Sequence, residues 1–77
     1  MKELLNYILS KIVTDPAEIS ISEDTNEYGE TVLNVTLPQE ERGIVIGKAG
    51  KNIESIRNIV SIIAKREGKK VRIKILD

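Results

Sequence analysis

The sequence predicts an α+β fold in which three helices pack on one face of a three-stranded mixed sheet. Apolar residues recur at helical spacing in two long segments, and they alternate with polar residues at a period of two in three shorter ones. The resulting order is helix, strand, strand, short helix, long helix, strand, abbreviated α-β-β-α-α-β. Because 77 residues suffice for one small domain, we expect residues 1–77 to fold as a single unit with a thin core.

The first half of the chain predicts a helix and a hairpin. Leucine and isoleucine spacing predicts an amphipathic helix over residues 2–13, which Asp15-Pro16 ends because proline disfavours helical angles in the preceding residue. Alternation over residues 18–22 and 31–37 predicts two antiparallel strands. The apolar face of the second strand consists of Leu33, Val35 and Leu37. Residues 23–30 are polar and acidic, so they predict a long loop between the strands.

The second half predicts a helical pair and a returning strand. Pro38, whose missing N–H is tolerated in a first turn, begins a short helix that runs through Ile46, and we expect the acids of its first turn, Glu40 and Glu41, to be solvated. A long helix is expected between Gly50 and Gly68. Its apolar stripe consists of Ile53, Ile56, Ile59, Val60, Ile63 and Ala64. Alternation over residues 71–75 predicts the last strand, and the long helix provides a crossover that lets this strand lie parallel to the second.

The composition argues against an enzyme. The chain contains no His and no Cys, so the usual general bases, nucleophiles and thiolate metal ligands are missing. We therefore expect no catalytic residue, no metal site and no cofactor. No apolar run approaches the roughly 18–20 residues needed to cross a bilayer. The N-terminus lacks the pattern of a signal peptide, so a cytoplasmic protein is expected.

Opposite charges occupy the two halves of the chain, although the formal net charge is zero. Residues 1–41 carry two lysines and nine acids, whereas residues 42–77 carry ten basic residues and three acids. A polyanion responds to the local field of the basic half and not to the total. Chance segregation on a solvated surface explains the same counts, so charge alone does not decide between these interpretations.

The most informative segment runs from Ile46 to Ile53. Gly47 and Gly50 lie between two helices, and they permit backbone angles and a close ligand approach that side chains would obstruct. The N-terminus of the long helix favours an anion, and Lys48 adds positive charge, so phosphate is the natural ligand. A Walker A loop is excluded because Asn52 stands where Ser or Thr is required, Val45 stands where the first glycine is required, and a helix comes before the loop; the Rossmann spacing is absent. An ordinary tight turn remains an equally good explanation of the loop in isolation.

The loop and its flanks resemble the core signature of K-homology (KH) domains, which is an I-G-x-x-G-x-x-I pattern between two helices. The matching stretch is residues 43–53. The element order resembles the type II arrangement, with an extension of a helix and a strand over residues 1–23 and a core with the G-x-x-G loop over residues 30–77. A stand-alone domain of this length resembles the small bacterial KH proteins of the KhpA family.

This resemblance implies an RNA-binding site. KH domains clamp about four backbone nucleotides of a single strand with the G-x-x-G loop. The bases would lie in a groove between the short helix, the long helix and the last strand. The candidate RNA-binding residues are Gly47, Lys48, Ala49, Gly50 and Lys51 at the loop, Gly43 and Ile44 on the groove floor, and Arg57 and Arg72 on its wall.

Some of these candidates have a plain structural alternative. Gly43 can ease helix packing, Ile44 can belong to the core, and the two arginines can be solvated. Ile46 and Ile53 belong to the motif, but we expect them in the core, where they fix the angle between the helices. The basic outer face of the last strand, residues 70–74, can contact RNA or protect an exposed edge from mispairing.

Two functions remain open. The first is binding of single-stranded RNA as a chaperone or post-transcriptional regulator. Two Tyr with no Phe or Trp provide no stacking platform, which predicts modest affinity and strong salt dependence. The second is a protein-interaction module, because Ile62 falls opposite the apolar stripe. The resemblance implies a homodimer, or a heterodimer with a larger KH-containing RNA-binding partner of the KhpB type, acting in cell elongation and envelope homeostasis.

Overall fold

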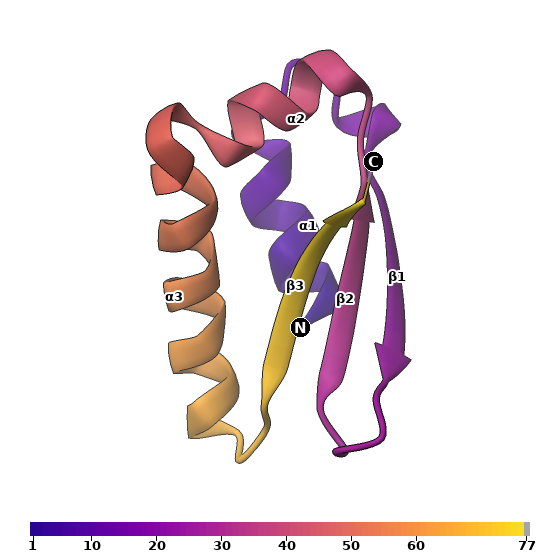
Figure 1. Ribbon diagram of the computed structural model, residues 1–77, viewed down its shortest axis with the longest axis vertical. Helices are drawn as coiled ribbons and strands as arrows, with labels where there is room; N and C mark the ends of the chain where they lie inside the picture. The colour runs from indigo at the N-terminus through magenta and orange to yellow at the C-terminus, as the bar shows by residue number, and fades with distance from the viewer. Residues whose placement is uncertain (77) are drawn as a thin grey trace.

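The computed structural model describes residues 1–76, and its elements follow the expected order (Figure 1). The helices are α1 (Lys2–Ser10), α2 (Gln39–Ile46) and α3 (Lys51–Arg66), and the strands are β1 (Ser20–Thr25), β2 (Thr31–Thr36) and β3 (Val71–Leu76). Short 3-10 turns occur at Pro16–Glu18 and Lys48–Gly50. This arrangement is the α-β-β-α-α-β order of the type II KH fold, which confirms the predicted fold class.

The sheet is mixed, as predicted, and its strand order is β1-β2-β3. Strand β1 pairs antiparallel with β2, so that Ser20 lies opposite Thr36. Strand β3 pairs parallel with β2, with Thr31 opposite Val71, and α3 makes the crossover that a parallel pair requires. Because β3 has β2 as its neighbour on one side, its other edge faces α3 and the surface described below.

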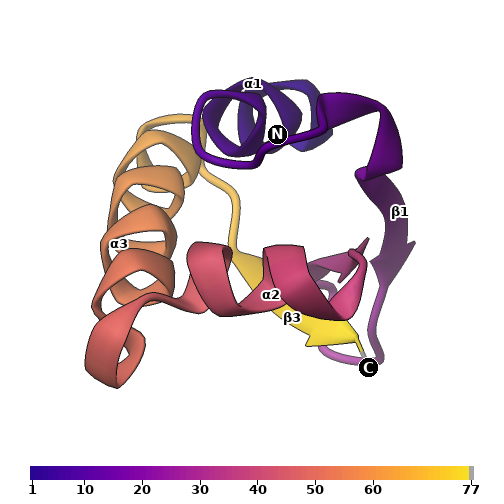
Figure 2. The same ribbon diagram turned by 90° about the horizontal axis from the view of Figure 1, so that it is seen from above.

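The core lies between the sheet and the helices. Seen from above, α1 and α3 lie on the same side of the sheet, and α2 crosses one end of the layer (Figure 2). The fully buried large side chains come from the three helices and from β2, and they are Leu5, Leu9, Leu33, Val35, Val45 and Val60. Helix α3 ends as expected: Lys65 and Arg66 occupy its last turn, and Gly68 adopts φ 71° in the chain reversal toward β3.

Several predicted boundaries were wrong. Helix α1 ends at Ser10, and its chain continues as a turn in which the N–H groups of Ile12 and Val13 both donate to the carbonyl of Leu9. Strand β1 starts later than predicted because the Asp15 side chain accepts a hydrogen bond from Ala17 N–H and stabilises a 3-10 turn at the expected start, and the strand also ends later, at Thr25. As a result, the loop between β1 and β2 shrinks to residues 26–30.

Three burial predictions also differ. Ile59 was expected in the apolar stripe of α3 but is 47% exposed, because this flank of α3 is left uncovered. Ile46 was expected in the core but is also exposed, whereas Ile53 is buried as predicted. Glu41 was expected on the solvated first turn of a helix, yet it is buried and its Oε2 accepts a hydrogen bond from Asp15 N–H at 2.9 Å.

Candidate nucleic-acid interface

The Gly47–Gly50 loop turns sharply between α2 and α3, at the upper left of Figure 1. Gly47 has φ 74° and ψ 177°, and Gly50 has φ 73° and ψ 13°. Residues with a Cβ adopt such positive φ values with difficulty, whereas glycine adopts them freely. Ala49 nevertheless has φ 57° and ψ 26°, so the loop holds one non-glycine residue in the left-handed region.

Gly47 leaves room for the side chain of Asn52. A Cβ at Gly47 would lie 2.6 Å from Asn52 Cγ and 2.8 Å from its Nδ2, distances that real Cβ atoms do not tolerate. Asn52 Nδ2 in turn donates a hydrogen bond to the carbonyl oxygen of Ile44 at 2.9 Å. This bond joins the first turn of α3 to α2 across the loop, so Gly47 and Asn52 together fix how the two helices meet.

Gly50 leaves the N-terminus of α3 open. A Cβ at Gly50 would meet nothing within 4 Å, and no side chain in residues 1–76 caps this helix. The first N–H groups of a helix lack intrahelical partners, and the helix dipole places partial positive charge there. Lys48, Ala49 and Lys51 are all exposed around this point. The loop therefore offers a passing anion the N-terminus of a helix that no side chain caps, exposed positive charge and no bulky side chain.

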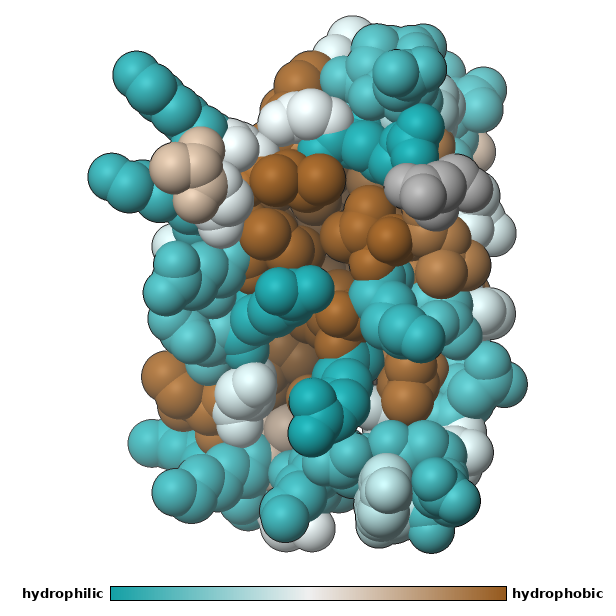
Figure 3. All heavy atoms as spheres, viewed as in Figure 1, coloured by the Kyte–Doolittle hydropathy of each residue, from teal (hydrophilic) through white to brown (hydrophobic). Residues whose placement is uncertain are grey.

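An apolar surface lies exposed where α2, α3 and β3 meet, with hydrophilic side chains around it (Figure 3). The exposed large apolar residues of α2 and β3 include Ile44, Ile46 and Leu76. Ile44 is thus not a core residue. Gly43 is exposed as well, and a Cβ there would meet no atom within 4 Å, so the packing of α2 does not require glycine at this position.

An open groove of about 610 Å³ lies between α3 and β3 and reaches the β1–β2 turn. Arg57 and Ser61 line it from α3, and Arg72 and Lys74 line it from β3. Apolar side chains, Val32, Val71 and Ile73, also line this groove. Arg57 Nη2 donates to the carbonyl oxygen of Ile73 at 3.2 Å, which ties the α3 wall to the β3 wall.

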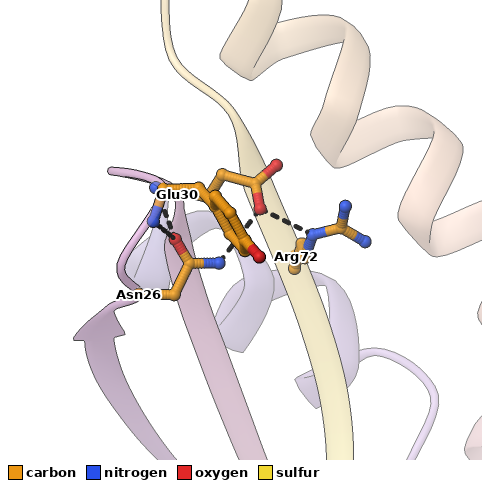
Figure 4. A network of polar contacts seen from close by, with 4 residues as sticks. Asn26, Glu30 and Arg72 are labelled. Atoms are coloured by element: carbon orange, nitrogen blue, oxygen red, sulfur yellow. Dashed lines mark hydrogen bonds and ion pairs between the residues drawn. The ribbon is translucent and has the colours of Figure 1, made fainter.

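Arg72 is held by a polar network at the β1–β2 turn (Figure 4). Arg72 Nε donates to Glu30 Oε1 at 2.9 Å, and Asn26 Nδ2 donates to the same oxygen at 3.0 Å. The hydrogen bonds from Asn26 and Arg72 lower the pKa of Glu30 below its ordinary value of 4.5, and Glu30 raises the pKa of Arg72. At neutral pH the two side chains therefore form an ion pair at the rim of the groove.

The candidate residues occupy a continuous strip of elements. Gly43 and Ile44 lie on α2, the next four in the loop, Lys51 and Arg57 on α3, and Arg72 on β3. Lys51 and Arg57 are six residues apart on one helix, which is about 9 Å along its axis. The loop and the groove thus lie one after the other along α3, which is the arrangement that an extended single strand requires.

The chain matches a known domain family over nearly its whole length. The family model described as the KH domain of KhpA/KhpB matches residues 2–75, which is nearly the whole chain. The chain belongs to the KhpA/KhpB KH-domain family. The match includes α1 and β1, so the N-terminal helix and strand are part of the family's domain.

Relatives within the family align from end to end. The chain is 36% identical to the RNA-binding protein KhpA of Clostridium acetobutylicum over 76 residues, covering 99% of this chain and 100% of the relative. It is 37% identical to the RNA-binding protein KhpA of Thermotoga maritima, with 99% of each chain covered. The protein of the same name from Chlamydia trachomatis is 31% identical over 77 residues, covering 100% of this chain and 97% of the relative.

Sequence reasoning missed three residues of this surface. Asn52 was noted only as a mismatch to the Walker A pattern, yet its side chain bridges the two helices beneath Gly47. Asn26 and Glu30 were assigned to a solvated acidic loop, yet they position Arg72. The N-x-x-x-E spacing across a turn that contains Gly29 was a weak signal, and the contact between Glu30 and Arg72 spans 42 positions, so no local pattern pointed to it.

Proposed function

We propose that this chain binds single-stranded RNA through the Gly47–Gly50 loop and the groove between α3 and β3, and that it acts by binding and not by catalysis. The observation that carries the proposal is the open N-terminus of α3, which is uncapped by any side chain in residues 1–76 and flanked by the exposed Lys48 and Lys51. Family membership supports the same ligand, because the relatives are named RNA-binding proteins.

The loop holds the phosphate backbone, and the groove receives bases. Backbone donors at a helix N-terminus bind phosphate oxygens irrespective of sequence. The apolar residues of the groove and of the surface beneath α2 offer contacts to bases without aromatic stacking. Binding of this type has modest affinity, which suits a chaperone or a post-transcriptional regulator that engages many transcripts.

The test is the double variant Lys48→Asp, Ala49→Asp, measured by fluorescence anisotropy with a labelled single-stranded RNA. We expect micromolar binding by the parent and its loss in the variant. Aspartate adopts the left-handed conformation of residue 49 more readily than alanine does, so the variant should retain its fold. A folded variant that binds RNA as tightly as the parent would show that the loop does not hold the backbone.

A second candidate function is assembly. Ile59 and Ile62 are 47% and 62% exposed, and their spacing of three residues makes them neighbours on the surface of α3. At 100° per residue they lie roughly opposite Arg57 on the helix, so a partner on this face leaves the groove open. We propose that this face mediates a homodimer or a heterodimer with a KhpB-type partner, which would join two weak grooves into one stronger binder. The proposal includes a role of that complex in cell elongation and envelope homeostasis, which is what the resemblance to the KhpA family implies.

Sedimentation equilibrium of the pure protein tests the self-association. We expect a dimer for the parent and a monomer for Ile62→Lys, with the change in mass accompanied by weaker binding of long RNA and unchanged binding of short oligonucleotides. A parent that remains monomeric at high concentration would exclude the homodimer.

A further inference from the structure

Arg72 presents a fixed pair of hydrogen-bond donors to the groove. Its Nε is occupied by Glu30 Oε1 at 2.9 Å, and the end of the guanidinium group is turned away from Glu30 (Figure 4). Nη1 and Nη2 of Arg72 make no hydrogen bond within residues 1–76, and the side chain is 67% exposed, so both groups are accessible to a ligand. The guanidinium is planar, so fixing Nε also limits the orientation of the two free donor groups.

Glu30 is itself held by the β1–β2 turn. Asn26 Oδ1 accepts hydrogen bonds from the backbone N–H groups of Tyr28 at 3.0 Å and Glu30 at 2.9 Å, while Asn26 Nδ2 donates to the Glu30 carboxylate. The Glu30 side chain is only 15% exposed. Arg72 is therefore oriented by a carboxylate that the backbone of a tight turn keeps in place.

The pairing with Glu30 changes what Arg72 can bind. The positive charge of Arg72 is compensated by a carboxylate at 2.9 Å, and that carboxylate repels a phosphate placed at the same point. The Nη1 and Nη2 donors remain, so this part of the groove suits a neutral ligand that presents two adjacent acceptors. The groove also provides apolar contacts from Val32, Val71 and Ile73, which favour a flat ring over a solvated anion.

Two RNA bases present adjacent acceptors: cytosine, through N3 and O2, and guanine, whose larger ring makes more contact with the apolar lining of the groove. The N7 and O6 of guanine are adjacent acceptors, and arginine binds them bidentately in the commonest base-specific contact. Adenine replaces the second acceptor with an amino donor, so it satisfies only one of the two Arg72 groups. In a single strand these base edges are free for such contacts. The groove volume of about 610 Å³ has room for a purine.

We propose that Arg72, oriented by Glu30, selects guanine at the position of the RNA strand that enters the groove between α3 and β3. This inference rests on the proposed RNA-binding function and adds a base preference to it. Lys48 and the loop hold the strand irrespective of sequence, and Arg72 supplies the discrimination.

The experiment compares labelled oligonucleotides of seven nucleotides by fluorescence anisotropy. Each has three uridines on either side of one central base, which is guanine, hypoxanthine, 7-deazaguanine, adenine or cytosine. We expect guanine and hypoxanthine, which share N7 and O6, to bind at least about fivefold more tightly than adenine and cytosine, the lower end of the range for one bidentate contact. Loss of N7 in 7-deazaguanine should remove part of that advantage.

The Arg72→Lys variant tests whether the paired donors of Arg72, and not its positive charge, cause the preference for guanine. Lysine keeps the positive charge but lacks the paired donors of the guanidinium group, so the preference for guanine over adenine should fall to nearly one. Arg66→Lys, the same substitution in the last turn of α3, is the matched control and should leave the preference unchanged. Glu30→Gln provides a second variant, and it should bind heptauridine more tightly while discriminating less between guanine and adenine.

The outcomes separate this inference from the proposed function. Equal affinities for all five oligonucleotides, a preference that persists in Arg72→Lys, or cytosine bound as tightly as guanine would each overturn the guanine selection and leave RNA binding intact. If the parent protein binds none of them, the proposed function fails, and the base selection fails with it.

Discussion

Replacing Gly47 with alanine probes the contact between the loop and Asn52. The backbone of Gly47, with φ 74° and ψ 177°, lies in a region that is essentially restricted to glycine, and occupying it with another residue costs about 1–3 kcal/mol. The new Cβ would also displace Asn52 and break its hydrogen bond to Ile44, a further ~0.5–1.5 kcal/mol. After the gain from a less flexible unfolded chain, we expect a net loss of about 2–3 kcal/mol.

This loss is large for a chain of 77 residues, whose total free energy of unfolding is expected at about 4–12 kcal/mol. Urea unfolding followed by far-UV circular dichroism measures it, since the chain has no Trp to report by fluorescence. Gly50→Ala is the matched control. Residue 50 has a similar φ but open space around its Cβ position, so its loss should be only about 1 kcal/mol.

A double-mutant cycle with Asn52→Ala measures the coupling between residues 47 and 52, which includes the steric contact and the hydrogen bond that both single variants lose. Asn52→Ala alone should lower the free energy of unfolding by about 1 kcal/mol, and it removes two of the three atoms that the new Cβ would meet. The double variant should therefore be about 1 kcal/mol more stable than the sum of the single losses predicts. Additive losses, or a Gly47→Ala variant as stable as Gly50→Ala, would refute the interpretation that Gly47 makes room for Asn52.

Three further predictions concern the loop and the Arg72 network. Ala49→Gly should raise the free energy of unfolding by about 0.5–1 kcal/mol in the same urea assay. Glycine removes the strain of the left-handed conformation at residue 49, and the added flexibility of the unfolded chain offsets only part of this gain. A destabilised variant would contradict the strain at Ala49. The depressed pKa of Glu30 predicts stability that is present above its ordinary pKa of 4.5 and lost as the pH falls through the lower folded value. Thermal unfolding from pH 7 to pH 2 should show this loss in the parent and less of it in Glu30→Gln, and identical profiles would argue against the ion pair. Lys48→Gln should reduce the slope of log affinity against log salt concentration for single-stranded RNA by about 0.7, and an unchanged slope would mean that Lys48 contacts no phosphate.

The order of elements was predictable because it depends on local periodicity. The alternation in β2 and β3 and the spacing in α3 each report one buried face, and burial confirmed Leu33, Val35 and Ile73 at the predicted positions. The width of the stripe on α3 was not predictable in the same way. Ile59 lies at its edge, and whether an edge residue is covered depends on where a neighbouring helix packs, which periodicity does not encode.

The candidate site shows the same difference between features that depend on local sequence and features that depend on long-range contacts. The loop glycines and their lysines were identified from a contiguous motif, and the structure gives both glycines the positive φ that the motif implies. Two contacts that hold the elements around the motif are long-range. Glu41 accepts a hydrogen bond from the backbone of Asp15, 26 positions away, and Glu30 holds Arg72 across 42 positions. A single sequence does not show which distant residues pair, so Glu30 and Glu41 were interpreted as solvated acids.

The parallel pairing of β2 with β3 has a consequence for how the domain folds. Thr31 aligns with Val71, so the pair joins segments forty positions apart, and a hairpin cannot nucleate it as it can β1 with β2. Helices α2 and α3 form the connection between the two strands, so closing this pair costs more loop entropy than closing the β1–β2 hairpin. The groove has one wall on α3 and one on β3, so it requires that β3 is paired in the sheet. The proposed base selection therefore depends on the most non-local pairing of the sheet, whereas the Gly47–Gly50 loop connects neighbouring elements.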